Sequence, residues 1–153
     1  MSTHKAVQVP SANEALTVVE VDTETGVVKL VRYAACDDVG NVVTSESLSG
    51  YRDRFGRDDY FFDHQGSRFV VLNSNIPFDP SQVPHEWKRQ REFAEDAVGE
   101  ARRQGVDHII VFTHHPLFLR DKDEEDSFVI LPRERRRVLL EMFHRHRVSA
   151  VFA

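Results

Sequence analysis

The clearest indication of the fold is the segment Asp107-His108-Ile109-Ile110-Val111-Phe112-Thr113-His114-His115-Pro116. Its β-branched and aromatic run, bounded by polar residues, is typical of a strand buried on both faces of a parallel sheet. Pro116 has no N–H to donate and takes the chain out of the sheet. In open α/β sheets, ligands bind just beyond the carboxyl ends of the strands, where His114 and His115 stand. Because neutral imidazole is a common metal ligand, the stretch predicts a ligand site at this edge.

The pattern from Ser67 onward alternates strand, helix, strand, helix, strand. The quoted strand is preceded by an expected helix over 85–104 and followed by a helix over 133–146 and a strand over 148–152. This alternation predicts parallel pairing with right-handed crossovers. The first half instead reads as two hairpins, over 16–33 and 59–74, so the sheet is expected to be mixed.

The remaining segments carry weaker signals. Met1 to Glu14 is polar and is expected to lack regular structure. Residues 34–44 and 75–84 are expected to be loops, because they contain turn formers and prolines. A short helix is expected to start with Ser45 or Ser47 as its cap and to end at Gly56.

Composition limits the class of protein. The chain has 153 residues, of which 41% are hydrophobic and 29% charged, as in a soluble globular domain. Its net charge of −5 gives no general electrostatic reason to bind nucleic acid or an acidic membrane. The single cysteine, Cys36, excludes an intrachain disulfide and suits a reducing compartment. With no apolar segment of membrane-spanning length and no signal peptide, a cytoplasmic protein is expected.

Several ordered blocks resemble one known family. They are Tyr51-Arg52-Asp53-Arg54-Phe55-Gly56, Tyr60-Phe61-Phe62-Asp63, Val71-Leu72-Asn73-Ser74, Val111 to Phe118 with its Phe-x-His-His-Pro core, Pro132 to Arg137 and Val148 to Ala153. Together they resemble the calcineurin-like metallophosphoesterases, specifically the purple-acid-phosphatase-like branch. The resemblance covers about residues 38–153. It divides the chain into an N-terminal segment, 1–37, with a β-hairpin that the family does not match, and a partial phosphoesterase domain, 38–153.

The resemblance implies an α/β fold in which a two-sheet sandwich is flanked by helices. It also implies hydrolysis of a small phosphoester substrate by two divalent metal ions, Mn, Fe or Zn. Family members take their metal ligands from five blocks, and the His-x-Pro block supplies one histidine. By this resemblance, His114 is the expected metal ligand, and no catalytic residue is assigned.

The other four metal blocks depart from the family pattern. Where Gly-Asn-His-Asp would stand, the sequence reads Ala35-Cys36-Asp37-Asp38. The blocks Asp-x-His and Gly-Asp-x-x-Asp are not found before residue 35, and the sequence stops at Ala153, where Gly-His-x-His would begin. The expectation is therefore a fragment or truncated copy with little or no activity by itself.

Three further residues are candidates for the pocket around His114. His115 is either a pocket residue or a structural histidine. Asp37 and Asp38 are either ligands for a hard metal or solvated turn formers in a loop rich in Gly and Asn. For the acidic run Asp121 to Asp126 and the basic run Arg133 to Arg137, a solvated loop and a solvated helix face are expected.

Two alternatives to a phosphoesterase stay open on the sequence. One is a non-catalytic pseudoenzyme or binding module that uses the same strands and helices without a metal. The other is a half-domain that associates with itself, because a missing half of a sandwich would leave apolar surface exposed.

Overall fold

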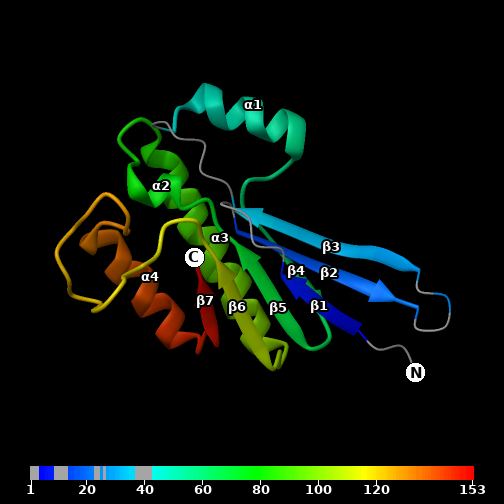
Figure 1. Ribbon diagram of the computed structural model, residues 1–153. Helices are drawn as coiled ribbons and strands as arrows, with labels where there is room; N and C mark the ends of the chain where they lie inside the picture. The colour runs from blue at the N-terminus through cyan, green and yellow to red at the C-terminus, as the bar shows by residue number, and fades with distance from the viewer. Residues whose placement is uncertain (1–3, 9–13, 23–24, 26, 37–42) are drawn as a thin grey trace. The chain divides into compact units, whose positions relative to one another are not determined.

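The computed structural model describes residues 4–8, 14–22, 25, 27–36 and 43–153 (Figure 1). The chain divides into two compact units, Met1–Asp38 and Val39–Ala153.

The first unit is a three-stranded antiparallel sheet in the order β1-β2-β3. Its strands are β1 (His4–Gln8), β2 (Glu14–Val21) and β3 (Val28–Cys36). The expected hairpin is confirmed, and its turn is closed by a hydrogen bond from the Asp22 amide to the Val27 carbonyl, 2.9 Å. The expectation of no regular structure before residue 14 was wrong, because β1 pairs with β2. The loop expected from residue 34 was also wrong at its start, because β3 continues to Cys36.

The second unit contains the mixed sheet that the sequence predicts. Its strands lie in the order β4-β5-β6-β7. The elements are α1 (Ser45–Phe55), β4 (Tyr60–His64), β5 (Ser67–Val71), α2 (Asn75–Phe78), α3 (Pro84–Arg103), β6 (His108–Phe112), α4 (Arg133–Arg145) and β7 (Ala150–Phe152). The β4–β5 pair is antiparallel, whereas β5–β6 and β6–β7 are parallel. Helices α3 and α4 provide the two crossovers.

The β4–β5 hairpin turns at Gln65 and Gly66, as expected. Both residues have positive φ, +48° and +75°, which is the conformation of a two-residue hairpin turn. A Cβ at Gly66 would lie 3.0 Å from a carboxylate oxygen of Asp107. Glycine therefore fits this turn for its backbone conformation and for the space around it.

The main core lies between one face of the sheet and the two long helices. Val70, Ile109 and Val111 point to this face and are fully or almost fully buried. They form one cluster with residues of α3 and α4, among them Ala94, Ala97, Val98, Ala101, Leu139, Met142 and Phe143. The helical spacing of apolar residues had predicted this packing for both helices.

The other face of the sheet corrects the expectation that β6 is buried on both sides. Along β6, the buried residues Ile109 and Val111 alternate with exposed His108 and with Ile110 and Phe112, which are half-buried. On the half-buried face, four phenylalanine rings, of Phe62, Phe69, Phe112 and Phe152, stack across the strands with centroid separations of 5.0, 6.4 and 5.6 Å. Phe152, on the edge strand, is 51% exposed. We call these four residues the phenylalanine ladder.

The N-cap of helix α1 lies one residue before the first of its two expected positions. Thr44 is the N-cap; its hydroxyl accepts the Ser47 amide hydrogen bond, 3.1 Å, while the Ser47 hydroxyl accepts that of the Thr44 amide, 3.0 Å. This reciprocal pair is a capping box, in which serine takes the place of the usual Glu or Gln. The helix ends at Gly56, as expected. The segment 75–84, expected to be a loop, contains the one-turn helix α2.

The fold class is thus confirmed as α/β with a mixed, helix-flanked sheet. Within the described part of the second unit there is one sheet, so the two-sheet sandwich stays a prediction. No helix in the described residues is long and apolar enough to cross a membrane.

Candidate functional site at the carboxyl ends of β5 and β6

Two short polar segments meet where β5 and β6 end. The strands run parallel, with Val71 opposite Phe112, so the residues that follow them emerge at the same edge of the sheet. The Ser74 hydroxyl oxygen lies 3.0 Å from the His114 amide nitrogen and 2.8 Å from that of His115. The sequence predicted the histidines at this edge. The structure shows in addition that the Ser74 hydroxyl accepts hydrogen bonds from both of their amides.

His114 is half-buried at the carboxyl end of β6. Its imidazole stands edge-on to the ring of His115, with centroids 5.0 Å apart and an interplanar angle of 83°. A half-buried imidazole at this edge of the sheet can reach a ligand placed beyond the strands. Whether His114 binds a metal is not tested by this geometry, so that role stays a prediction.

His115 is more enclosed than His114. Its ring stacks on Phe78 of α2, with centroids 4.3 Å apart, and its Nδ1 lies 3.0 Å from the Ser74 hydroxyl. Its carbonyl accepts a hydrogen bond from the Thr113 hydroxyl, 3.0 Å. These contacts fix His115 within the protein and favour the structural alternative left open by the sequence.

Asp37 and Asp38, the other candidate pocket residues, lie outside the described residues. The structure therefore says nothing about their distance from His114, and their role as metal ligands stays a prediction.

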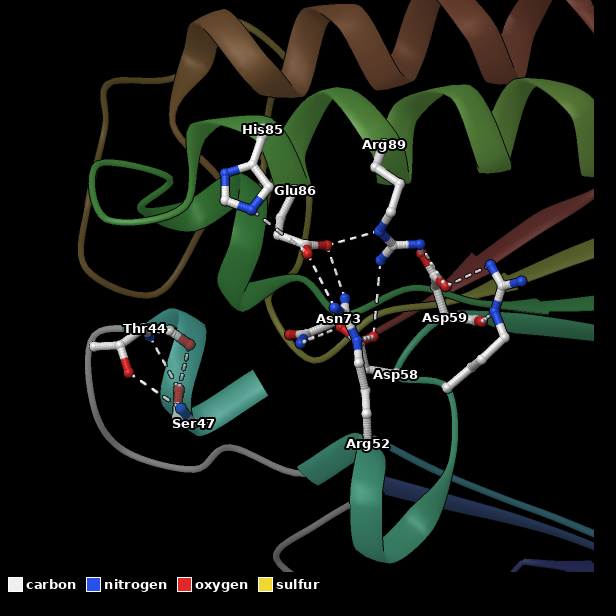
Figure 2. A network of polar contacts seen from close by, with 10 residues as sticks. Thr44, Ser47, Arg52, Asp58, Asp59, Asn73, His85, Glu86 and Arg89 are labelled. Carbon is white, nitrogen blue, oxygen red and sulfur yellow. Dashed lines mark hydrogen bonds and ion pairs between the residues drawn. The ribbon is translucent and has the colours of Figure 1, made fainter. Parts of the chain in front are cut away.

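Three buried carboxylates and the arginines that pair with them form a network that contacts Asn73, next to Ser74 (Figure 2). Arg52 binds Glu86 through two hydrogen bonds, 2.9 and 2.7 Å, and Asp58 through a third, 2.7 Å. Arg89 donates to Glu86, 2.6 Å, and to Asp59, 3.1 Å. Asn73, the residue before Ser74, donates to Asp58, 3.0 Å. The network thus ties α1, the start of β4 and the beginning of α3 to the segment that carries Ser74.

The charges of this network are balanced. Three carboxylates, those of Asp58, Asp59 and Glu86, face three guanidinium groups, those of Arg52, Arg57 and Arg89. The hydrogen bonds from Arg52, supported by Arg89, lower the pKa of Glu86 from 4.5 to about 2. The same pairing raises the pKa of Arg52 further above its usual range. Carboxylates neutralised in this way are poor ligands for a cation, so we interpret the network as structural.

The described residues do not fit a two-metal centre by themselves. Among them, no group of three or more His, Cys, Asp or Glu side chains is placed to hold a metal ion. A divalent metal takes at least four ligands, and two metals need more. The part of the chain that the structure describes thus offers His114 as one candidate ligand and no complete set.

The segment after the histidines folds back onto α4. The Leu131 amide donates to the Pro116 carbonyl, 3.0 Å, which closes the loop between them. Within this loop Asp126 accepts the Arg133 amide hydrogen bond, 2.6 Å, at the start of α4. Arg136 is fully buried and donates to the carbonyls of Leu117 and Glu124. A wholly solvated basic face was therefore the wrong expectation for α4, because Arg136 secures the loop.

Comparison with known proteins gives the family. No protein-family model matches the chain. Serine/threonine-protein phosphatase CPPED1 of Rattus norvegicus is 32% identical over 146 residues, which cover 95% of this chain and 45% of the relative. The proteins of the same name from Homo sapiens and Danio rerio are 32% and 34% identical, over 82% of this chain and 40% and 41% of their own lengths. The chain is a distant homologue of the CPPED1 phosphatases, which are calcineurin-like phosphoesterases.

This homology confirms the resemblance found in the sequence. The relatives are phosphatases by name, and phosphatases are phosphoric ester hydrolases. The chain spans less than half the length of the curated relatives that it matches. The activity of a whole relative therefore reaches this chain only as a proposal.

Two parts of the site were not predicted from the sequence. Asn73 and Ser74 stood in a block quoted for the resemblance, but no role was given to them. Their position directly after a strand parallel to β6 was an available signal, since both carboxyl ends meet at one edge. The ion-pair network was also missed, because its members are spread over more than 30 residues of sequence.

Proposed function

We propose that this chain is part of a metal-dependent phosphoesterase and that His114 is its contribution to the metal site. The observation that carries the proposal is the position of His114 at the carboxyl end of β6, in a chain homologous to phosphatases over most of its length. The proposed substrate is a phosphoester. Since the relatives are named as serine/threonine-protein phosphatases, a phosphoserine or phosphothreonine peptide is the substrate to try first.

We propose low activity for the chain by itself. The reason is chemical, since a single imidazole cannot hold a divalent ion firmly, and the described residues supply no set of three ligands. Asp37 and Asp38 are the candidates for further ligands from this chain. In the family-type sandwich, which we propose as the complete fold, a second sheet would pack on the phenylalanine ladder and bring the remaining ligands.

The second candidate is a non-catalytic role, as a pseudoenzyme or a binding module. It is favoured by one observation: Asp58, which binds Asn73 beside the site, is paired with an arginine, as are Asp59 and Glu86 of the same network. A chain with this role would fold but would not hydrolyse phosphoesters.

Hydrolysis assays separate the two candidates. The purified chain is given an aryl phosphate monoester, an aryl diester and a phosphothreonine peptide, with Mn²⁺, Zn²⁺ or Fe²⁺ added in turn. His114→Ala removes the candidate ligand. His144→Ala is the matched control, because it removes an exposed imidazole at the other end of the strands, near the C-terminus of α4.

The phosphoesterase proposal predicts weak turnover that depends on metal, is lost in His114→Ala and is kept in His144→Ala. Turnover that is equal in both variants would contradict the role of His114. Absence of metal-dependent turnover in the folded wild-type chain would favour the non-catalytic candidate.

Self-association, left open by the sequence, stays a prediction. On the face of the phenylalanine ladder the strand positions are aromatic, aliphatic, serine or histidine, while Asp63 and Arg68 lie on the helix-covered face. A face without Asp, Glu, Lys or Arg does not repel a second copy of itself. Sedimentation velocity at increasing concentration checks this, and a monomer at all concentrations would contradict it.

A further inference from the structure

The hydroxyl of Ser74 contacts three polar groups of His114 and His115. Ser74 follows β5 and precedes α2, and is only 1% exposed. Its Oγ lies within hydrogen-bond distance of the amide nitrogens of His114 and His115 and of the Nδ1 atom of His115, at 3.0, 2.8 and 3.0 Å. A buried hydroxyl with three partners leaves no freedom in the direction of its hydrogen.

The chemistry of these partners decides which way each hydrogen bond runs. The two backbone N–H groups can only donate, so they use both lone pairs of the Ser74 oxygen. The hydroxyl hydrogen is then available to one acceptor, the Nδ1 atom of His115. This atom must therefore be unprotonated, and the proton of the neutral imidazole is on Nε2.

The segment that carries Ser74 is itself fixed from the opposite side. Asn73 donates to Asp58, 3.0 Å, and accepts the hydrogen bond of the Asn75 amide, 3.2 Å. Asp58 is held in turn by Arg52 of α1. The position of the Ser74 hydroxyl is thus set by the ion-pair network and not by the histidines alone.

We propose that Ser74 is a positioning residue for His114. By accepting the hydrogen bonds of two successive amides it fixes the backbone from which the His114 imidazole projects, and by donating to His115 it fixes that ring as the Nε2–H tautomer. This proposal rests on the proposed function in so far as His114 binds the metal. Its effects on the backbone and on the tautomer are independent of any metal.

The tautomer is measured first, in the wild-type chain, by long-range ¹H–¹⁵N correlation of the His115 ring at neutral pH. The expected spectrum shows an unprotonated Nδ1 and a protonated Nε2. A ring protonated on Nδ1 would overturn the proposal, because the Ser74 oxygen would then have to accept three hydrogen bonds. This test needs no variant, so it does not depend on the folding of one.

Amide hydrogen exchange measures the backbone effect. Ser74→Ala is expected to speed the exchange of the His114 and His115 amides roughly tenfold. Ser149→Ala is the matched control, because the Ser149 hydroxyl accepts the Ile109 amide hydrogen bond, 3.2 Å, at the other end of β6. It is expected to leave the two histidine amides unchanged. Equal exchange of these amides in the wild type and in Ser74→Ala would overturn the proposal.

Addition of Mn²⁺ alone separates this proposal from the proposed function. Paramagnetic broadening of the His114 ring is expected in the wild type and is expected to weaken severalfold in Ser74→Ala, with Ser74→Thr restoring it through the retained hydroxyl. Unchanged broadening in Ser74→Ala would refute positioning and leave the metal role of His114 intact. Absence of broadening in the wild type would refute the proposed function, while the tautomer and exchange still decide what Ser74 does.

Discussion

Arg52 and Glu86 lie 34 residues apart in the sequence and form a bidentate ion pair, with nitrogen–oxygen distances of 2.9 and 2.7 Å. The pair joins α1 to the first turn of α3, and through Asp58 it reaches the segment that holds the site. The pair is therefore expected to contribute both to the stability of the second unit and to the position of the segment that carries Ser74.

Removal of the Glu86 charge is expected to destabilise the protein. Glu86→Gln leaves Arg52 and Arg89 without their shared carboxylate, at an expected cost of about 2 to 3 kcal/mol in the free energy of unfolding. Urea denaturation measures it. Glu92→Gln is the control, because the Lys88–Glu92 pair is exposed and 3.9 Å long; its expected cost is below about 0.5 kcal/mol. Equal costs for the two variants would contradict the structural role of the network.

The same pair predicts how stability depends on pH. The hydrogen bonds from Arg52 lower the pKa of Glu86 from 4.5 to about 2, so the unfolded chain takes up this proton at a higher pH than the folded one. The stabilisation is complete above the ordinary pKa and is lost as the pH falls from 4.5 toward 2. Urea midpoints measured across this range should fall less steeply in Glu86→Gln than in the wild type. Parallel pH profiles would show that Glu86 is not the group responsible.

Replacement of Arg68 by lysine is expected to destabilise the protein. It is 2% exposed, binds Asp63 through two hydrogen bonds of 2.7 and 2.8 Å, donates to the Ala97 carbonyl and lies 4.1 Å from the centre of the Phe61 ring. Because an ammonium group cannot reproduce this planar fork, Arg68→Lys should cost about 2 to 4 kcal/mol. Thermal denaturation checks it against Arg91→Lys, an exposed substitution on α3, for which little change is expected.

Replacement by alanine should lower the stability of the protein at one glycine and raise it at another. Gly66 has a φ of +75°, which strains a residue with a Cβ, and that Cβ would also lie 3.0 Å from a carboxylate oxygen of Asp107, so Gly66→Ala should destabilise by about 1 kcal/mol or more. Gly50 lies within α1 with open space around its Cβ position, so Gly50→Ala should stabilise by about 0.5 to 1 kcal/mol. Chemical denaturation of both variants measures the difference. A loss of stability in Gly50→Ala would mean that α1 is not the regular helix described.

The sequence predicted the parts of the fold that depend on local pattern. Apolar periodicity located α3, α4 and β6, and Gln65-Gly66 located the β4–β5 hairpin. Periodicity could not show that one face of the sheet carries an aromatic ladder. The four phenylalanines come one from each strand, so the pattern of a single strand does not reveal them. The cap of α1 was misplaced by one residue, because Thr44, Ser45 and Ser47 are all good caps by residue type.

The sequence predicted the part of the site that lies at the end of β6. His114 and His115 were placed at the correct edge because a strand followed by proline defines where it ends. The predicted parallel pairing already brought the segment of Ser74 to this edge, but the hydrogen bonds from the His114 and His115 amides to its hydroxyl are visible only in the structure. The burial of Arg136 likewise depends on the loop between Pro116 and Leu131, whose closure is not encoded in the helix that carries the arginine.

The measurement that tests the central proposal most directly is a titration of the chain with Mn²⁺, followed by NMR of its histidine side chains. A weakly bound ion still broadens the nuclei beside it, so the experiment needs no complete metal site and no turnover. The His114 ring signals are expected to broaden first, while those of His144 remain sharp, and His114→Ala is expected to remove this selectivity. Broadening that begins at the acidic residues 121–126 and leaves His114 unaffected would contradict the assignment of His114 as a metal ligand.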